Sequence, residues 1–319
     1  MDPLTLVLFL IGLVLLTAGA DVLVKGAASL AAGLGISPLI IGLTVVAFGT
    51  SAPELSVSVS SAWSGQADIA LGNVVGSNIC NVLLILGLAA LAAPLVVQPQ
   101  LVRFDVPVMI ACGVLLLLVS LDGVISRLDG LLLSAGLVAY VLALLFKSRN
   151  DKALADSMRD EAGLDAGAGA RPLRNLVLVV AGLAMLVVGA GWLVDGAVML
   201  ARGLGVSELV IGLTIVAVGT SLPELATSVM ASIRGQRDIA IGNVVGSNIF
   251  NILCVLGLSS LVSPAGIRVA PEALAFDIPV MLAVSVFCLP LFWLGYRISR
   301  LRGALLLAAY AAYVSLLIG

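Results

Sequence analysis

The chain has 319 residues, of which 61% are hydrophobic and 11% are charged, and its mean hydropathy is +1.22. A soluble domain is excluded, because a folded soluble protein must keep much polar area in contact with water. The formal net charge is −2 and there is no basic block, which argues against nucleic acid as a partner. The composition therefore predicts a polytopic membrane protein.

Apolar runs of the length needed to cross a bilayer recur along the whole chain. The first, MDPLTLVLFLIGLVLLTAGA, ends in small residues as a signal peptide does, but it carries Asp2 in place of a basic region, so we expect a retained helix. About ten transmembrane helices are predicted. They lie near residues 3–33, 38–63, 69–93, 104–121 and 128–146 in one half, and near 173–201, 208–233, 239–263, 274–295 and 303–318 in the other.

The two halves of the chain are copies of one sequence. LTVVAFGTSAPELSVSVSSAWSGQADIALGNVVGSNICNVLLILGLAAL begins at Leu43, and LTIVAVGTSLPELATSVMASIRGQRDIAIGNVVGSNIFNILCVLGLSSL begins at Leu213, an offset of 170 residues. The offset is 172 between FDVPVM at Phe104 and FDIPVM at Phe276. We therefore expect a first five-helix repeat at 1–146, a short polar linker at 147–172 and a second five-helix repeat at 173–319.

An odd number of helices in each half places the second half upside down in the membrane. The loop charges indicate the same inversion, since residues 64–68 contain no basic residue and their counterparts 234–238 contain two. Basic residues collect in cytoplasmic loops, so the N-terminus is expected outside and the linker in the cytoplasm. The predicted fold class is an all-α polytopic membrane protein made of two inverted five-helix repeats.

The second helix of each half carries a carboxylate inside the membrane. Glu54 follows Pro53 in GTSAPE, Glu224 follows Pro223 in GTSLPE, and neither segment contains Lys or Arg. A carboxylate at the bilayer centre costs at least ~2.5–3.5 kcal/mol on insertion scales, so it normally has a partner or a function. Each proline frees a helical carbonyl beside the hydroxyls of the motif. These oxygens predict a site for Ca²⁺ and Na⁺, and the alternative is a protonated glutamate that bonds two helices together.

The third helix of each half carries a polar stripe with a spacing of four residues. The deeper serine and asparagine of each stripe are ligand candidates, whereas the first asparagine has a packing role as its alternative. G-x-x-x-G pairs on the same helices favour close packing. The stripes are Asn73, Ser77 and Asn81 in the first half, and Asn243, Ser247 and Asn251 in the second.

Taken together, GTSAPE…GNVVGSNICN and GTSLPE…GNVVGSNIFN resemble the alpha repeats of the sodium/calcium exchanger family, part of the wider cation/calcium antiporter group. The resemblance covers the whole ten-helix layout. It implies that the two Pro-Glu glutamates are the principal calcium ligands and that other oxygens complete overlapping calcium and sodium sites. The implied ligands are Glu54, Glu224, Thr50, Thr220, Ser51, Ser221, Ser77, Ser247, Asn81 and Asn251, with the main-chain oxygens of Ala47 and Ala217.

The resemblance also bears on potassium. Potassium-dependent members, and some prokaryotic ones, carry aspartate where this chain has Asn251, and here both Asn251 and its counterpart Asn81 are neutral. The expected site therefore holds two carboxylates rather than three, which argues against potassium co-transport.

The expected function is secondary active antiport of Na⁺ for Ca²⁺ across the cell membrane by alternating access, with the lipid bilayer as surroundings. Two carboxylates neutralise one Ca²⁺ or two Na⁺, and an empty charged site is costly to carry across a membrane. An H⁺/Ca²⁺ antiporter, or one for another divalent cation, is the first alternative. A passive cation channel is less favoured, because a site with two carboxylates releases ions slowly.

No enzyme and no cofactor are expected. The chain has no histidine, and its serines lack an identifiable base, which argues against an intramembrane hydrolase. The cysteines lack metal-ligand spacing and are interpreted as small buried hydrophobic residues. They are Cys80, Cys112, Cys254 and Cys288. The sequence leaves the oligomeric state open.

Overall fold

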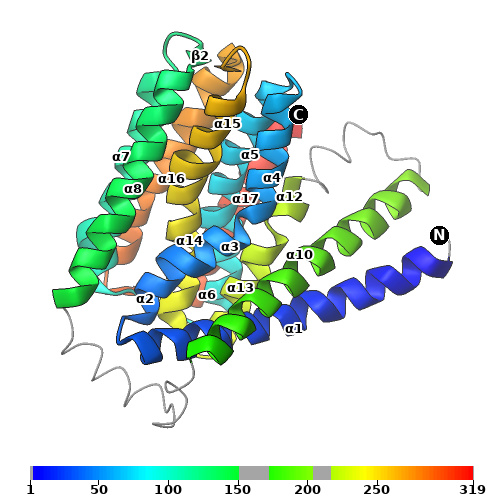
Figure 1. Ribbon diagram of the computed structural model, residues 1–319, viewed down its shortest axis with the longest axis vertical. Helices are drawn as coiled ribbons and strands as arrows, with labels where there is room; N and C mark the ends of the chain where they lie inside the picture. The colour runs from blue at the N-terminus through cyan, green and yellow to red at the C-terminus, as the bar shows by residue number, and fades with distance from the viewer. Residues whose placement is uncertain (1–2, 151–171, 204–216, 319) are drawn as a thin grey trace.

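The computed structural model describes residues 3–150, 172–203 and 217–318. Two long helices, α1 (Pro3–Leu34) and α10 (Pro172–Gly203), lie side by side and cross obliquely to the remaining helices (Figure 1). The other helices form an upright bundle beside this pair (Figure 1). The pairing of α1 with α10 joins the first helix of one half to the first helix of the other.

In each half the first helix is followed by a broken second helix, a third helix, and two further helices. The first half continues with α2 (Pro38–Ile41), η1 (Gly42–Val46), α3 (Ala47–Thr50), α4 (Ala52–Trp63), α5 (Ala67–Cys80), η2 (Asn81–Ile85), α6 (Leu86–Ala92), η3 (Leu101–Asp105), α7 (Val106–Val119) and α8 (Arg127–Asn150). The second continues with α12 (Ala217–Thr220), α13 (Leu222–Ile233), α14 (Arg237–Phe250), η5 (Asn251–Leu256), α15 (Gly257–Val262), η6 (Ala273–Asp277), α16 (Ile278–Trp293) and α17 (Arg300–Ile318). Where both halves are described, they present the same order of helical elements.

Eight helices of the described chain are long and apolar enough to cross a membrane, and the bent pair Pro38–Thr50 with Ala52–Trp63 supplies a ninth span. Part of the remaining expected span, 208–233, lies outside the described residues, and its described part ends in the apolar helix Leu222–Ile233. The predicted layout of about ten spans agrees with this arrangement.

The second helix of the first half breaks at Ser51. Its two parts meet at an angle of 46°, and Ser51 has a ψ of 9°, outside the helical range. Pro53 in the first turn of α4 has no N–H to offer the preceding helix, so the chain restarts a helix there. Ser221, which precedes Pro223 and α13, has the same conformation with a ψ of 7°. The duplicated Ser-x-Pro-Glu sequence thus produces two half-helices that carry the glutamates in their first turns.

Wide π-turns occur at equivalent places in both halves, which the sequence did not predict. η2 begins at Asn81 and η5 at Asn251, directly after α5 and α14. A second pair, η3 and η6, ends at Asp105 and Asp277. Single π-turns inside helices are often found at functional sites, and two of these begin at predicted ligands.

A seam of glycines holds α1 against α10. On α10, a Cβ at Gly182 would lie 2.6 Å from the main-chain nitrogen of Leu23, and one at Gly189 would lie 2.7 Å from that of Leu16. On α1, a Cβ at Gly19 would lie 2.8 Å from the Cβ of Met185. Contacts this short leave room only for glycine, so the two backbones touch along the seam.

Two short antiparallel strand pairs tie the halves together at opposite ends of the bundle. β1 (Leu95–Val96) pairs with β4 (Arg297–Ile298), and β2 (Val124–Ile125) pairs with β3 (Ile267–Arg268). Beside them, Arg127 Nε donates to the carbonyl oxygen of Ser263 at 3.1 Å, and Arg300 Nε donates to that of Leu91 at 3.1 Å. Each arginine therefore caps the end of the third helix of the other half.

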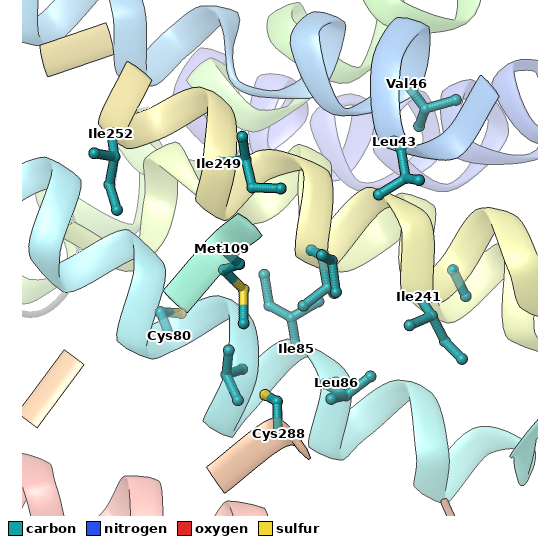
Figure 2. Packing of buried hydrophobic residues seen from close by; sticks show 14 of the residues in the cluster. Leu43, Val46, Cys80, Ile85, Leu86, Met109, Ile241, Ile249, Ile252 and Cys288 are labelled. Atoms are coloured by element: carbon teal, nitrogen blue, oxygen red, sulfur yellow. The ribbon is translucent and has the colours of Figure 1, made fainter. Parts of the chain in front are cut away.

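The third helices α5 and α14 lie in the centre of the molecule. The apolar window of the span Arg237–Val262 is 100% buried, and a Cβ at Gly246 would lie 2.7 Å from the carbonyl oxygen of Leu43, as expected for a packing glycine. Figure 2 shows the apolar packing here, with Met109 of α7, Ile249 of α14 and Cys288 of α16 among the side chains of one buried cluster. The four cysteines are free and buried, which confirms their interpretation as small hydrophobic residues.

Candidate ion-binding site

Two buried carboxylates lie at the starts of the two half-helices. Glu54 in the first turn of α4 and Glu224 in the first turn of α13 are each only 1% exposed. The N-terminus of a helix carries a partial positive charge, which stabilises an anion there. Among the described residues neither glutamate forms an ion pair with Lys or Arg. Their charge therefore needs another source of compensation.

Each carboxylate is bonded to a hydroxyl of the opposite half. Ser51 Oγ donates to Glu224 Oε1 at 2.9 Å, and Ser221 Oγ donates to Glu54 Oε1 at 3.1 Å. Ser221 Oγ also lies 3.3 Å from Ser77 Oγ on α5. These contacts bring both helix breaks and a third helix to one place, although the two Pro-Glu motifs are 170 residues apart in sequence.

Several oxygens of the predicted ligands are buried and lack a hydrogen-bond partner within the described part of the chain. Since nearly all buried polar atoms in proteins are satisfied, unpaired oxygens on the carboxylates and on the polar stripes of the third helices are candidates for binding a cation. They are Glu54 Oε2, Glu224 Oε2, Ser247 Oγ, Asn81 Oδ1 and Asn251 Oδ1. All five belong to residues that the sequence predicted as ligands.

The predicted threonine ligands are held by the first asparagine of the opposite stripe. Thr50 Oγ1 donates to Asn243 Oδ1 at 3.0 Å, and Thr220 Oγ1 lies 3.5 Å from Asn73 Oδ1. Asn243 Nδ2 donates in turn to the carbonyl oxygen of Glu224 at 3.3 Å. Asn73 and Asn243 therefore join the helix breaks of the two halves, which is more than the packing role left open for them.

The main-chain oxygens implied by the resemblance lie directly before the breaks. The carbonyl oxygen of Ala47 accepts a hydrogen bond from Ser51 N at 3.0 Å and lies 3.3 Å from Thr50 Oγ1. Ala217 occupies the equivalent position as the first residue of α12. The structure thus places Ala47 beside two predicted hydroxyl ligands.

Four polar residues near the site were missed by the sequence analysis. Ser58 and Ser228 each accept a hydrogen bond from the first asparagine of their own half at 2.9 Å. Asn78 and Asn248 bond to each other across the centre. Their recurrence 170 residues apart was a usable signal, but Asn78 and Asn248 fall outside the spacing of four that defined the stripes.

The site is made of oxygen atoms alone. No group of three His, Cys, Asp or Glu suited to a metal occurs among residues 3–150, 172–203 and 217–318. Hydroxyl, amide and main-chain oxygens must therefore complete any coordination that the two carboxylates begin. This chemistry suits hard cations such as Ca²⁺ and Na⁺ rather than soft metals.

The duplicated broken helices and the oxygen-lined centre are features of membrane ion exchangers. The sequence profile of the sodium/calcium exchanger protein family matches residues 4–146 and 174–319, so the chain belongs to that family. The sodium/calcium exchanger MaX1 of Methanosarcina acetivorans is 36% identical over 97% of both chains. The inner membrane protein YrbG of Escherichia coli K12 is 40% identical over 97% of this chain and 95% of its own length.

A solved structure has the same fold. The sodium-calcium exchanger NCX_Mj, soaked with zero Na⁺ and Ca²⁺, superimposes with a TM-score of 0.83 at 33% identity and covers 99% of both chains. The likeness therefore extends over all of the helices and not only over the central motifs. The chain is a multi-pass membrane antiporter of the exchanger family.

Proposed function

We propose that the protein exchanges Na⁺ for Ca²⁺ across the cell membrane by alternating access, with both ions competing for Glu54 and Glu224. The observation that carries the proposal is the pair of buried carboxylates. Each is bonded to a serine of the other half, and each has one oxygen without a hydrogen-bond partner among the described residues. The remaining ligands are the predicted hydroxyl, amide and main-chain oxygens.

The charge of the site explains why exchange occurs instead of leak. Two carboxylates balance one Ca²⁺ or two Na⁺, whereas an empty site would carry two uncompensated charges through a medium of low dielectric. The protein therefore changes its open side only when it is loaded. Further Na⁺ ions bind at the neutral hydroxyl and carbonyl positions.

The remaining features follow from the inverted repeat. The first repeat spans 1–146, the linker 147–172 is cytoplasmic, and the second repeat spans 173–319, with the N-terminus outside. The paired helices α1 and α10 pack against the broken helices, since α1 contacts α13 and α10 contacts α3 and α12. Sliding of this pair opens the site to one side at a time.

The test is Ca²⁺ uptake into proteoliposomes of purified protein, driven either by a Na⁺ gradient or by a pH gradient. Uptake that follows the Na⁺ gradient supports the proposal. Uptake that ignores Na⁺ and follows pH supports the H⁺/Ca²⁺ alternative, which keeps the same two carboxylates. Uptake that needs no counter-ion gradient identifies a channel.

The assignment of the glutamates is tested by Glu54→Gln and Glu224→Gln. We expect each to lower the exchange rate at least about 100-fold, because the site loses half of its negative charge. Removing one partner of a buried ion pair, here a carboxylate paired with the bound cation, costs several kcal/mol. Asp105→Asn is the matched control, because Asp105 is also fully buried. The asparagine variant keeps the Oδ1 that accepts the hydrogen bond from Tyr140 OH. Full exchange by either glutamine variant would refute the assignment.

A further inference from the structure

Four buried asparagines form a hydrogen-bonded network at the ends of α5 and α14 and the starts of η2 and η5. They are Asn78, Asn81, Asn248 and Asn251, here called the asparagine quartet, and none is more than 2% exposed. Asn78 Nδ2 donates to the carbonyl oxygen of Asn248 at 3.2 Å, and Asn248 Nδ2 donates to that of Asn78 at 3.3 Å. The two bonds are related by the symmetry of the repeat.

Main-chain carbonyls fix the direction of the side-chain amides of Asn78 and Asn248, and these two amides in turn fix the direction of the other two in the quartet. A carbonyl oxygen only accepts, so Asn78 must turn its nitrogen toward Asn248 and its oxygen away. That oxygen accepts from Asn251 Nδ2 at 3.0 Å, and Asn248 Oδ1 accepts from Asn81 Nδ2 at 3.0 Å. Asn81 and Asn251 therefore commit their nitrogens to the quartet, which leaves their oxygens on the other side.

The freed oxygens are those left without a partner. Asn81 Oδ1 and Asn251 Oδ1 are buried and unpaired among the described residues. Asn81 follows Ser77 by one helical turn, and Ser77 bonds to the Ser221 hydroxyl that holds Glu54. The oxygen of Asn81 is thus one turn from the carboxylate site, and the repeat places Asn251 equivalently beside Ser247.

We propose that Asn78 and Asn248 are positioning residues that turn the amide oxygens of Asn251 and Asn81 toward the transported cation. The inference rests on the proposed ion site and assigns to it two residues that do not touch the ion. Met281 Sδ and Met109 Sδ lie 3.6 Å from the nitrogens of Asn78 and Asn248, so α16 and α7 brace the quartet from both halves.

In this network Asn251 acts as the donor to Asn78 Oδ1, at 3.0 Å. An ionised carboxylate at position 251 would direct an oxygen at that acceptor, so the quartet favours a neutral side chain there.

The test is Ca²⁺ binding to the purified protein, measured by calorimetry in detergent, in two crossed double-mutant cycles. Removing a partner that orients a metal ligand typically weakens metal binding about 10–100-fold, and we expect this of Asn78→Ala and Asn248→Ala. Asn78→Ala should add nothing further once Asn251→Ala is present, and Asn248→Ala nothing further once Asn81→Ala is present. In the crossed combinations, the fold-losses of Ca²⁺ affinity of the two single variants should multiply. These combinations are Asn78→Ala with Asn81→Ala and Asn248→Ala with Asn251→Ala.

Equal multiplication in all four combinations, or unchanged affinity in Asn78→Ala, would overturn the positioning role. Thermal unfolding of each variant in detergent without Ca²⁺ is the second measurement, and we expect Asn78→Ala and Asn251→Ala each to retain a cooperative transition. If Asn78→Ala loses Ca²⁺ affinity only together with that transition, the loss is one of folding and the positioning role is refuted. Ca²⁺ binding is measured without an ion gradient, so it tests the positioning role independently of transport. Failure of Na⁺ coupling in proteoliposomes would refute the proposed exchange, and the binding results would still decide the positioning role.

Discussion

At the scale of single residues, the site is built from bonds that cross between the halves. Neither glutamate receives its hydroxyl hydrogen bond from its own half, because Ser221 donates to Glu54 and Ser51 donates to Glu224. Thr50 likewise bonds to Asn243 rather than to the asparagine of its own half. A change in one half therefore acts on the carboxylate of the other half.

Ser51→Ala and Ser221→Ala test this crossing. A hydrogen bond to a charged group contributes about 1.5–3 kcal/mol, so each variant should weaken Ca²⁺ binding roughly 10–100-fold. Calorimetry of the purified variants gives the affinity. Ser285→Ala is the control, since Ser285 is buried in α16 and, in the described part of the chain, its hydroxyl bonds within its own helix to the carbonyl oxygen of Met281 at 2.9 Å. Equal affinities in all three variants would contradict the crossed arrangement.

At the scale of helices, the glycine seam makes α1 and α10 one unit. The backbones approach so closely that Gly182 and Gly189 have no room for a Cβ, whereas Gly191 on the same helix has nothing within 4 Å of that position. Close approach of this kind is driven by van der Waals packing, because lipid offers no hydrophobic gain for joining two apolar helices. A pair bound along its length can slide without separating.

Gly189→Ala and Gly191→Ala are a matched pair for this seam. Overpacking costs typically about 1–3 kcal/mol, so Gly189→Ala should lower the thermal unfolding temperature and the exchange rate. Gly191→Ala adds its methyl group to open space and should leave both unchanged or raise the stability, since alanine is favoured over glycine in a helix. Thermal unfolding of both variants in detergent is the measurement, and equal unfolding temperatures would show that the seam is not tightly packed.

At the scale of the whole molecule, inversion determines where the halves meet. The strand pairs β1–β4 and β2–β3 each take one strand from either half, and their arginine caps are exchanged in the same way. Two copies with opposite directions thus share both ends of the bundle as well as its centre. The broken second helices then approach each other midway between these ends.

Gln66→Cys and Gln236→Cys test the inversion directly. The two glutamines are repeat equivalents that directly precede α5 and α14, and the four native cysteines are buried, so they give little background labelling. In intact cells, a membrane-impermeant maleimide should label the Gln66→Cys variant from outside and the Gln236→Cys variant only after the cells are opened. Labelling of both from the same side would refute the inverted topology.

The amino-acid sequence by itself determined the duplication, the membrane class, the broken second helices and most of the candidate ligand residues. These features depend on local chemistry, because hydropathy, proline and an uncompensated carboxylate have the same meaning wherever the chain places them. The recurrence of the Pro-Glu motif, with Glu54 in one half and Glu224 in the other, then indicated the candidate ion site. The spacing of four also identified Ser77 and Asn81 with their counterparts.

Only the tertiary structure decided which residues meet. The bonds from Ser221 to Glu54 and from Ser51 to Glu224 cross between halves, and no periodicity within one helix specifies a partner on another. The same holds for Asn78 and Asn248, which lie beside the predicted stripes and bond across them. The sequence states which side chains are polar, whereas the direction of an amide depends on carbonyls that only the packed helices bring within reach.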